Sequence, residues 1–422
     1  MRVPPQHRVV IGALLTQFFV IGSMFAYGVF FKALESELGW SRTLLSAATS
    51  MAFLVMGLGA MVAGRASDHF GPRLVLTLSG ASLGIGYLLM MFMDAPWQLF
   101  VLYGGLVGVG LATHDVVTLS TVAHWFPGRR GVMTGIVKSG TALGQVTLPL
   151  LCTALIVAYG WRVASLWLGV LALLALVLAA QLMRRPLPAE STALLERARA
   201  ASRPGAPDPS RGWAFAPARR TRQFWTLCGA QFLFFPTLIT VPVHIVAHGS
   251  DLGLSTGVAA AVLSTLGGVS IVGRLLVGFF VDRIGGRNGY LVCFSSLLAS
   301  LTLLLVIRDP AWLFLFAALY GFAHGGFFTV VSPTVAEVFG MRSHGAIFGI
   351  VVFCGTLGGA IGPVLAGSVF DVLGSYQVAF GILAGFSALG LLLMLTLRPL
   401  PADDPHGDPA PAVAPISEPG RA

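Results

Sequence analysis

Arg274 stands inside a stretch that is otherwise apolar, VGRLLVGFFVDRIGGR, which runs from Val272 to Arg287. It precedes Asp282 by eight residues, which on a helix corresponds to about 12 Å. If this stretch crosses a membrane, an arginine at that depth costs roughly 2.5 to 3.5 kcal/mol and should face a cavity and an anion. No other acidic residue lies at comparable depth in the C-terminal half, which leaves Asp115 or a substrate carboxylate. We favour the substrate over a structural salt bridge, because a planar guanidinium binds a carboxylate through two parallel hydrogen bonds.

Lys138 is a second basic residue at similar depth, eight positions after Arg130. Its neighbours at helical spacing are Thr134, Thr141 and Gln145, so one face of an apolar helix is polar. That face is expected to line a pathway. The alternative is a lysine whose ammonium reaches up to the membrane surface, which a position near the midplane makes difficult. Lys138 is therefore a second candidate for binding an anion.

His114 and Asp115 are adjacent, with Thr118 one turn later. Adjacent helical residues point about 100° apart, so only one of the two is expected to face the pathway squarely. Asp115 is a candidate carrier of a coupling proton or a permanent ion-pair partner of Lys138, and the two roles stay open. His114 is a second proton-coupling candidate because imidazole titrates near neutral pH.

Four aromatic residues are weaker candidates for a substrate site. Tyr320 and His324 share a helical face at four-residue spacing, and Phe25 and Tyr27 lie in the first apolar run. Packing is the better explanation for them, although a small organic acid would need an apolar wall beside its carboxylate.

The elements that position these residues are predicted from composition. Of 422 residues, 56% are hydrophobic and 10% are charged, whereas soluble proteins carry charges on about a quarter of their residues. A helix needs about 20 apolar residues to cross a membrane. The chain is therefore predicted to be an all-α membrane protein with twelve transmembrane helices, at residues 9–31, 43–64, 73–93, 97–123, 132–158, 162–183, 224–247, 256–280, 289–307, 312–334, 345–370 and 376–397.

The basic residues predict the orientation, because cytoplasmic loops of membrane proteins are enriched in Lys and Arg. With the N-terminus inside, 20 of the 26 Lys and Arg residues fall in cytoplasmic segments, four fall outside, and two lie within spans. Both termini are expected in the cytoplasm, in a multi-pass protein of the cell membrane. The net charge of +9 does not indicate nucleic-acid binding, because these residues lie in short loops beside apolar helices.

The spans form two halves that repeat each other. Residues 184–223 are rich in Arg, Pro and Ala and predict a cytoplasmic linker between a six-helix bundle at 1–183 and another at 224–398. The Pro-rich residues 399–422 predict a disordered cytoplasmic tail. Several residues recur 214 positions later, among them the pairs Gly64 with Gly278, Asp68 with Asp282, and Gly131 with Gly345.

The segment from Gly64 to Arg73, GRASDHFGPR, resembles the signature loop of the major facilitator superfamily, and Gly278 to Arg287 resembles its second copy. The resemblance covers residues 9–398 and implies two pseudo-symmetric six-helix bundles that rock around a site near the midplane. It makes four charged loop residues gating candidates: Asp68, Arg73, Asp282 and Arg283.

Within that superfamily, the segments GVFFKALESELGWSR, HWFPGRRGVMTGIVKSG and VDRIGGR look like bacterial members of the monocarboxylate transporter and oxalate/formate exchanger group. That resemblance implies a carboxylate-binding arginine in the eighth helix, an aspartate one turn earlier and a lysine in the first helix. Arg274 matches the arginine, but Ser270 stands in place of the aspartate and Phe25 in place of the lysine. Either Lys138 and Asp115 restore the charge pattern, or anions are exchanged without a proton.

We therefore expect a secondary active transporter that moves a small organic anion, most simply a monocarboxylate, by alternating access. An organic-anion exchanger and proton-driven efflux of hydrophobic compounds are the alternatives, the latter suggested by the motif GGAIGPVLAG. The expected partners are the substrate, the lipid bilayer and protons, and the protein is expected to work as a monomer. The sequence predicts no enzyme activity, cofactor or metal site, because it shows no nucleotide loop, metal cluster or convincing nucleophile.

Overall fold

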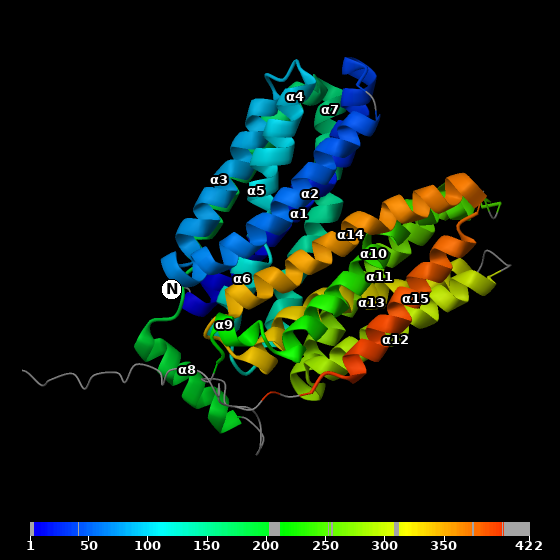
Figure 1. Cartoon of the computed structure of the whole chain (residues 1–422). Helices are drawn as coiled ribbons and strands as arrows, with labels where there is room; N and C mark the ends of the chain where they lie inside the picture. Colours follow the sequence, from blue (N-terminus) through cyan, green and yellow to red (C-terminus); the bar gives the residue numbers. More distant parts are fainter. Residues whose placement is uncertain are drawn as a thin grey trace, which may run out of the picture.

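The computed structural model describes residues 4–40, 42–201, 212–251, 253–254, 256–307, 312–373, 375–398 and 400. These residues are almost entirely helical, as Figure 1 shows. The helices of the first half are α1 (Pro5–Leu38), α2 (Arg42–Phe70), α3 (Pro72–Met90), α4 (Pro96–Leu99), the π-helical η1 (Phe100–Val107), α5 (Gly108–Leu111), α6 (Val116–Trp125) and α7 (Arg130–Leu182). Those that follow are α8 (Pro188–Ala201), α9 (Phe215–Ala218), α10 (Arg222–Asp251), α11 (Thr256–Ile284), α12 (Gly286–Val306), α13 (Trp312–Phe339), α14 (His344–Leu373) and α15 (Gln377–Leu395).

Eleven helical spans within the described residues are long and apolar enough to cross a membrane, against twelve predicted. The difference lies in α7, whose 53 residues cover the two predicted spans at 132–158 and 162–183. Its backbone breaks at Gly160, where φ is 80° and ψ is 163°. A glycine adopts this conformation without steric cost, so the chain reverses here with almost no loop. With α7 counted as two spans, the predicted all-α architecture is confirmed.

The fourth span differs from the continuous helix predicted at 97–123. It consists of α4, η1 and α5, then a turn at residues 112–115, then α6. Glycine has a low helix propensity. Four glycines precede the turn, at positions 104, 105, 108 and 110. The break leaves backbone carbonyl groups free to accept hydrogen bonds from side chains, and it falls at the candidate residues His114 and Asp115.

The helices form two groups, α1–α7 and α10–α15, which diverge from a shared end near α6 and α9 (Figure 1). We call this the closed end. There α2 packs on α14, and α7 packs on α11. A Cβ atom added to Gly345 would stand 2.8 Å from the carbonyl oxygen of Gly64, and one added to Gly131 would stand 2.6 Å from that of Gly278. The backbones therefore touch where any larger residue would separate them.

The predicted linker contains α8 and α9. On the side of the first half, Arg184 donates two hydrogen bonds of 2.7 Å to the Glu190 carboxylate, which lowers the pKa of Glu190 to about 2. On the other side, the backbone N–H of Trp213 donates to the Phe339 carbonyl at 2.7 Å. The described parts of the linker are thus attached to opposite halves. The predicted tail, 399–422, lies outside the described residues except for residue 400.

Candidate functional site

A buried ion pair lies at the centre of the first half. The Lys138 ammonium is 2.5 Å from Oδ1 of Asp115, and the two residues are 1% and 9% exposed. Lys138 comes from α7, and Asp115 comes from the break before α6. Asp115 is thus in contact with Lys138, and both of its roles, permanent ion-pair partner and carrier of a coupling proton, stay open. Among the described side chains that are buried, Asp115 is the only carboxylate.

Gln17 of α1 holds this pair in place. Its side-chain N–H groups donate to Oδ1 of Asp115 at 2.9 Å and to the backbone carbonyl of His114 at 2.8 Å. Its side-chain oxygen accepts a hydrogen bond of 2.8 Å from the Thr141 hydroxyl. Thr118 completes the network through the His114 carbonyl. An amide that both donates and accepts in this way fixes the position of the carboxylate without changing the charge.

His114 and Asp115 both belong to this network, and which of them faces the pathway stays a prediction. The Nε2 atom of His114 lies 3.5 Å from Oδ1 of Asp115, and its Nδ1 atom lies 2.6 Å from the Leu111 carbonyl oxygen. The expectation assumed a regular helix. Residues 112–115 form a turn that interrupts the helix at this point.

Arg274 of α11 faces this network from the second half. Its side chain is fully buried, and its Nη1 atom donates to the Ser270 hydroxyl at 3.3 Å. The Nε and Nη2 atoms have no hydrogen-bond partner among the described residues. These two nitrogens share one edge of the guanidinium, where their N–H bonds are parallel. That edge matches the two oxygens of a carboxylate.

The Phe328 ring of α13 brings the two cations to one place. The Lys138 ammonium lies 4.7 Å from the ring centroid, and the Arg274 guanidinium carbon lies 5.8 Å from it. His324, one turn earlier on α13, packs its ring 5.5 Å from the same centroid. An aromatic face attracts cations from both sides, so Phe328 joins the charged groups of the two halves.

We call Asp115, Lys138, Arg274, His324 and Phe328 the central cluster. The charges of this cluster do not cancel. Lys138 and Asp115 neutralise each other, whereas Arg274 is a buried guanidinium with no carboxylate within ion-pair distance among the described residues. A buried charge without a partner is costly, and a cluster with one net positive charge is suited to a monoanion.

Of three further predicted residues, Tyr320 reaches this cluster only through His324, with ring centroids 5.9 Å apart, whereas Tyr27 and Phe25 make no described contact with it. Tyr27 stacks on Tyr103 with centroids 3.8 Å apart and donates to the Leu45 carbonyl. Tyr320 is fully buried and donates to the Thr237 carbonyl at 2.8 Å. Both are held by packing contacts, as the sequence favoured. Phe25 is 47% exposed on α1 and contributes no described contact to the cluster.

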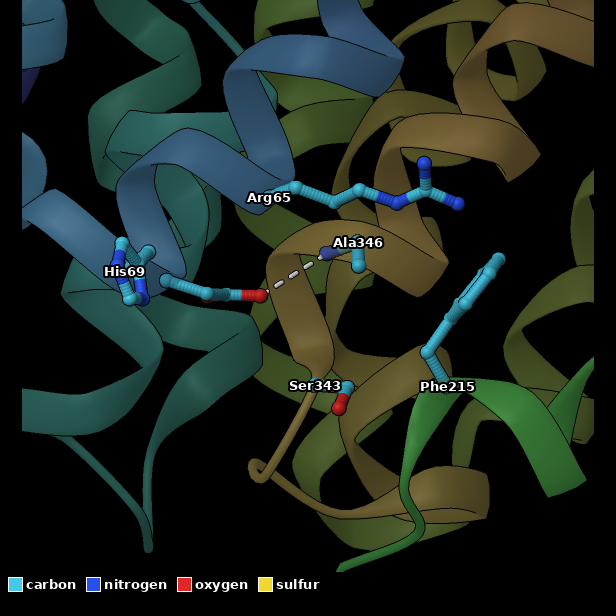
Figure 2. Close-up of a pocket in the computed structure, with 6 residues that line it drawn as sticks. Arg65, His69, Phe215, Ser343 and Ala346 are labelled. Atoms are coloured by element: carbon cyan, nitrogen blue, oxygen red, sulfur yellow. Dashed lines mark hydrogen bonds between the residues drawn. The ribbon is translucent and has the colours of Figure 1, made fainter.

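Two of the four gating candidates, Asp68 and Asp282, form hydrogen bonds with the opposite half. A carboxylate oxygen of Asp68 accepts a hydrogen bond of 3.1 Å from the backbone N–H of Ala346, which Figure 2 shows. In the same way Asp282 accepts hydrogen bonds of 2.7 and 3.0 Å from the backbone N–H groups of Gly131 and Val132. Each aspartate thus satisfies the first turn of a helix in the opposite half, where the helix dipole also favours a negative charge.

The contacts of Arg73 and Arg283 lie within their own halves in the part of the chain that the structure describes, and their gating role stays a prediction. The Arg73 guanidinium donates to the Gln181 carbonyl within its own half, and Arg283 lies 4.1 Å over the Phe279 ring of its own helix. Arg185 instead binds Asp68 at 2.6 Å. A loop motif indicates which charges are present, but the side chain that each one reaches depends on the packing.

A hollow of about 350 Å³ adjoins Asp68 at the closed end (Figure 2). The guanidinium carbon of Arg65 lies 4.7 Å over the ring of Phe215, a linker residue. The hollow is lined by Arg65, Asp68, His69, Phe215, Ser343 and Ala346. The end of the linker therefore contacts the first half beside the aspartate that joins the halves.

Gln17, Phe328 and Arg185 were not predicted as functional residues. Gln17 is the one polar residue in LLTQFFVIG besides Thr16, and that isolation was a usable signal. Phe328 had no such signal, because it is one of 29 phenylalanines. Arg185 had no such signal either, because it is one of several arginines in the linker at residues 184–223.

Comparison with known proteins shows the family to which the chain belongs. The family model of the Major Facilitator Superfamily matches residues 13–307 and, in a second match, residues 245–418. The chain is 28% identical over 399 residues to monocarboxylate transporter 13 of Rattus norvegicus, covering 92% of this chain and 88% of that protein.

Two solved structures share the fold. The proton:xylose symporter XylE bound to 6-bromo-6-deoxy-D-glucose superposes with a TM-score of 0.70 at 15% identity, over 93% of this chain and 96% of its own. The human organic anion transporter MFSD10 superposes with a TM-score of 0.68 at 18% identity, over 93% of this chain and all of its own.

Proposed function

The chain belongs to the Major Facilitator Superfamily, as a multi-pass membrane transporter and not an enzyme, and from this premise we propose that it carries a small monocarboxylate by alternating access. Arg274 would bind the carboxylate. The observation that carries the proposal is the free edge of its buried guanidinium, formed by Nε and Nη2.

The surroundings of Arg274 support an anion with one charge and a small apolar body. The cluster has one net positive charge, because Asp115 already neutralises Lys138. Phe328 and His324 offer ring surface beside the guanidinium. The relative named as a monocarboxylate transporter is similar over nearly the whole chain and agrees with this substrate class. A cationic drug would meet an uncompensated positive charge at this point, which argues against efflux of such compounds.

Coupling to protons would use Asp115. When a carboxylate binds Arg274, Lys138 lies on the same Phe328 ring and can turn towards the new anion. Asp115 would then lose its cationic partner while Gln17 still holds it, which favours uptake of a proton. This exchange of partners would link substrate and proton without the aspartate that the family pattern places at Ser270.

The contacts at the closed end favour one state of the transport cycle. Both aspartate bridges join the halves there, on the side predicted to be cytoplasmic, and the halves diverge towards the other side (Figure 1). We infer an outward-facing conformation. Transport would require both bridges to break and the halves to rock about the central cluster.

The test is uptake of radiolabelled lactate, pyruvate and other short monocarboxylates into proteoliposomes. We expect saturable uptake by the wild type and a loss of at least about 30-fold in Arg274→Ala, since an unpaired buried carboxylate costs roughly 2 kcal/mol or more. Arg274→Lys should recover little, because an ammonium cannot form the parallel pair of bonds. Arg197→Ala removes an exposed arginine of α8 and should behave as wild type. Unchanged uptake by Arg274→Ala would contradict the proposal.

Coupling is measured on the same vesicles. Symport predicts that an inward pH gradient drives accumulation and that Asp115→Asn removes the pH dependence. Exchange predicts instead that uptake depends on substrate loaded inside, with or without a gradient. Dependence on internal substrate alone would rule out the role of Asp115 in coupling while leaving Arg274 as the anion site.

A further inference from the structure

Three arginines surround a small hollow at the closed end of the first half. They come from different segments: Arg8 from α1, Arg73 from the start of α3, and Arg184 from just after α7. The hollow measures about 160 Å³, and a water molecule in the liquid occupies about 30 Å³, so a tetrahedral anion has room there. It is lined by Pro5, Arg8, Arg73, Gln181, Leu182 and Arg184.

The charges around this hollow are mostly uncompensated. Arg184 is paired with Glu190, and Arg73 uses one nitrogen on the Gln181 carbonyl at 3.2 Å. The Arg8 side chain makes no hydrogen bond or ion pair with the described part of the chain, although its backbone N–H donates to the Pro4 carbonyl. Three guanidiniums therefore face one carboxylate. Guanidinium groups bind phosphate oxygens in pairs, which makes a phosphate group the ligand that this arrangement fits best.

The same three helices also carry exposed apolar side chains close in sequence to the arginines of the hollow. Ile11 of α1 is 48% exposed, Leu74 of α3 is 50% exposed, and Leu178 of α7 is 65% exposed. Each lies within two turns of its arginine along the chain. In a membrane protein such a surface contacts acyl chains. A lipid whose phosphate enters the hollow could thus lay its chains on these residues, which a soluble phosphate would not use.

The three arginines and two of the three apolar residues recur in the second half at the 214-residue offset, whereas the counterpart of Leu74 is Asn288. The counterparts of the three arginines are Arg222, Arg287 and Arg398. Arg287 donates to the Leu395 carbonyl at 2.9 Å, just as Arg73 donates to Gln181, and 395 is 181 plus 214. The counterparts of Ile11 and Leu178 are Trp225 and Leu392, which are 61% and 60% exposed.

This recurrence says more than the general excess of basic residues in cytoplasmic loops. That excess sets a count of Lys and Arg near the ends of spans, but it does not demand arginine at three matched positions. Basic pockets between transmembrane helices bind the head groups of anionic lipids. We propose that the hollow between Arg8, Arg73 and Arg184 binds the phosphate of an anionic phospholipid, and that Arg222, Arg287 and Arg398 mark an equivalent position in the second half.

The experiment titrates the purified full chain, in a neutral detergent, with phosphatidylglycerol, phosphatidylcholine or inorganic phosphate, and follows the thermal midpoint. A ligand that binds only the folded state raises that midpoint. We expect phosphatidylglycerol to raise it at concentrations about tenfold lower than phosphatidylcholine, and inorganic phosphate to have no effect at the same concentrations.

The variants locate the site. Arg8→Gln replaces an exposed side chain and removes no hydrogen bond or ion pair among the described residues, so its fold should be intact, and it should weaken the response to phosphatidylglycerol about fivefold. Arg73→Gln should weaken it similarly. Arg197→Gln removes one exposed arginine from α8, outside the hollow, and should respond as wild type.

Three results would overturn the proposal. An equal rise with inorganic phosphate would identify a soluble anion as the ligand. An equal loss in Arg197→Gln would show general charge attraction, and an unchanged response in Arg8→Gln would show that lipid binds elsewhere. Mass spectrometry of lipids that co-purify with wild type and with Arg8→Gln gives an independent readout, with phosphatidylglycerol enriched only on the wild type. None of these measurements depends on the transported substrate.

Discussion

The contacts of the closed end are repeated in the two halves, whereas the residues of the central cluster are not. At the closed end, Asp68 binds the first turn of α14, and Asp282 binds the first turn of α7. The two aspartates are 214 residues apart, and so are Val132 and Ala346, whose backbone N–H groups donate to them. Both copies of the contact are kept, each made between one half and the other.

The central cluster keeps almost nothing of that symmetry. The positions 214 residues from Lys138, Asp115 and Arg274 hold Val352, Thr329 and Ala60. A motion that rocks two halves needs matched contacts on both sides of the axis. A small asymmetric substrate needs a binding site that is not repeated. We therefore infer that the repeated residues serve the motion of the halves and that the unrepeated residues determine the substrate specificity.

The largest expected effect tests the central cluster. Lys138→Met leaves the buried Asp115 carboxylate without its cation and should destabilise the protein by about 3 to 5 kcal/mol. Arg274→Met removes a buried charge that has no carboxylate partner, so it should not destabilise, although it abolishes binding. The thermal midpoints of the two variants, measured side by side, check this contrast.

The double variant Asp115→Asn with Lys138→Met is the control for that prediction. It removes both charges and keeps an amide for Gln17, so most of the stability should return while coupling stays lost. If Arg274→Met were the less stable of the two single variants, Arg274 would be the structural charge and the assignment of roles in the cluster would be reversed.

The next effect tests the glycine contacts of the closed end. A methyl group on Gly131 or Gly345 meets a backbone oxygen at less than 3 Å, so each alanine variant should disfavour the closed end by roughly 1 to 3 kcal/mol. Spin labels at Phe70 and Ile284, which are exposed and lie in opposite halves, report the separation of the halves. Both variants should lengthen that distance distribution by similar amounts. Gly39→Ala is not a suitable control because of its positive φ, whereas Gly385→Ala meets no atom within 4 Å and is suitable.

A smaller effect tests the aspartates. Asp68→Asn and Asp282→Asn each lose a charge-assisted contact with a helix N-terminus, worth about 1 kcal/mol. The same labels should report a modest opening, equal in the two variants. An opening in only one of the two variants would show that the two copies of the contact do not stabilise the closed end equally.

The smallest effect tests the linker. Phe215→Ala removes the ring under the Arg65 guanidinium, a contact worth about 0.5 to 1 kcal/mol at an exposed site. The variant should slightly lengthen the distance between the spin labels at Phe70 and Ile284. Phe279→Ala removes the same kind of contact, with Arg283, inside one helix and should leave the distance unchanged. Equal shifts in both variants would show that the linker contact does not join the halves.

Much of this architecture could be predicted from the sequence, because hydrophobicity over about 20 residues is a strong signal and the 214-residue offset is exact in several glycines and in Asp68. Arg274, Lys138 and Asp115 were predicted because charges are costly in a membrane. Their mutual arrangement remained open, since spacing along a helix does not say which helix lies opposite.

Other features depended on packing or on local backbone. The break at residues 112–115 sits in a run of apolar residues and glycines that also suits a straight helix. The near absence of a loop at Gly160 depends on one residue with positive φ. Arg73 and Arg283 have the right charge for gating, but their side chains reach a carbonyl and a ring within their own half.

The attachment of the linker to opposite halves suggests where the gene could be divided. Glu190 holds α8 to Arg184, and the Trp213 backbone is bonded to Phe339, so a cut between residues 201 and 212 severs neither contact. Two fragments expressed together from such a cut would each retain their own piece of linker. They should reassemble through the paired contacts of the closed end, giving a split transporter whose halves can be labelled, mutated and supplied separately.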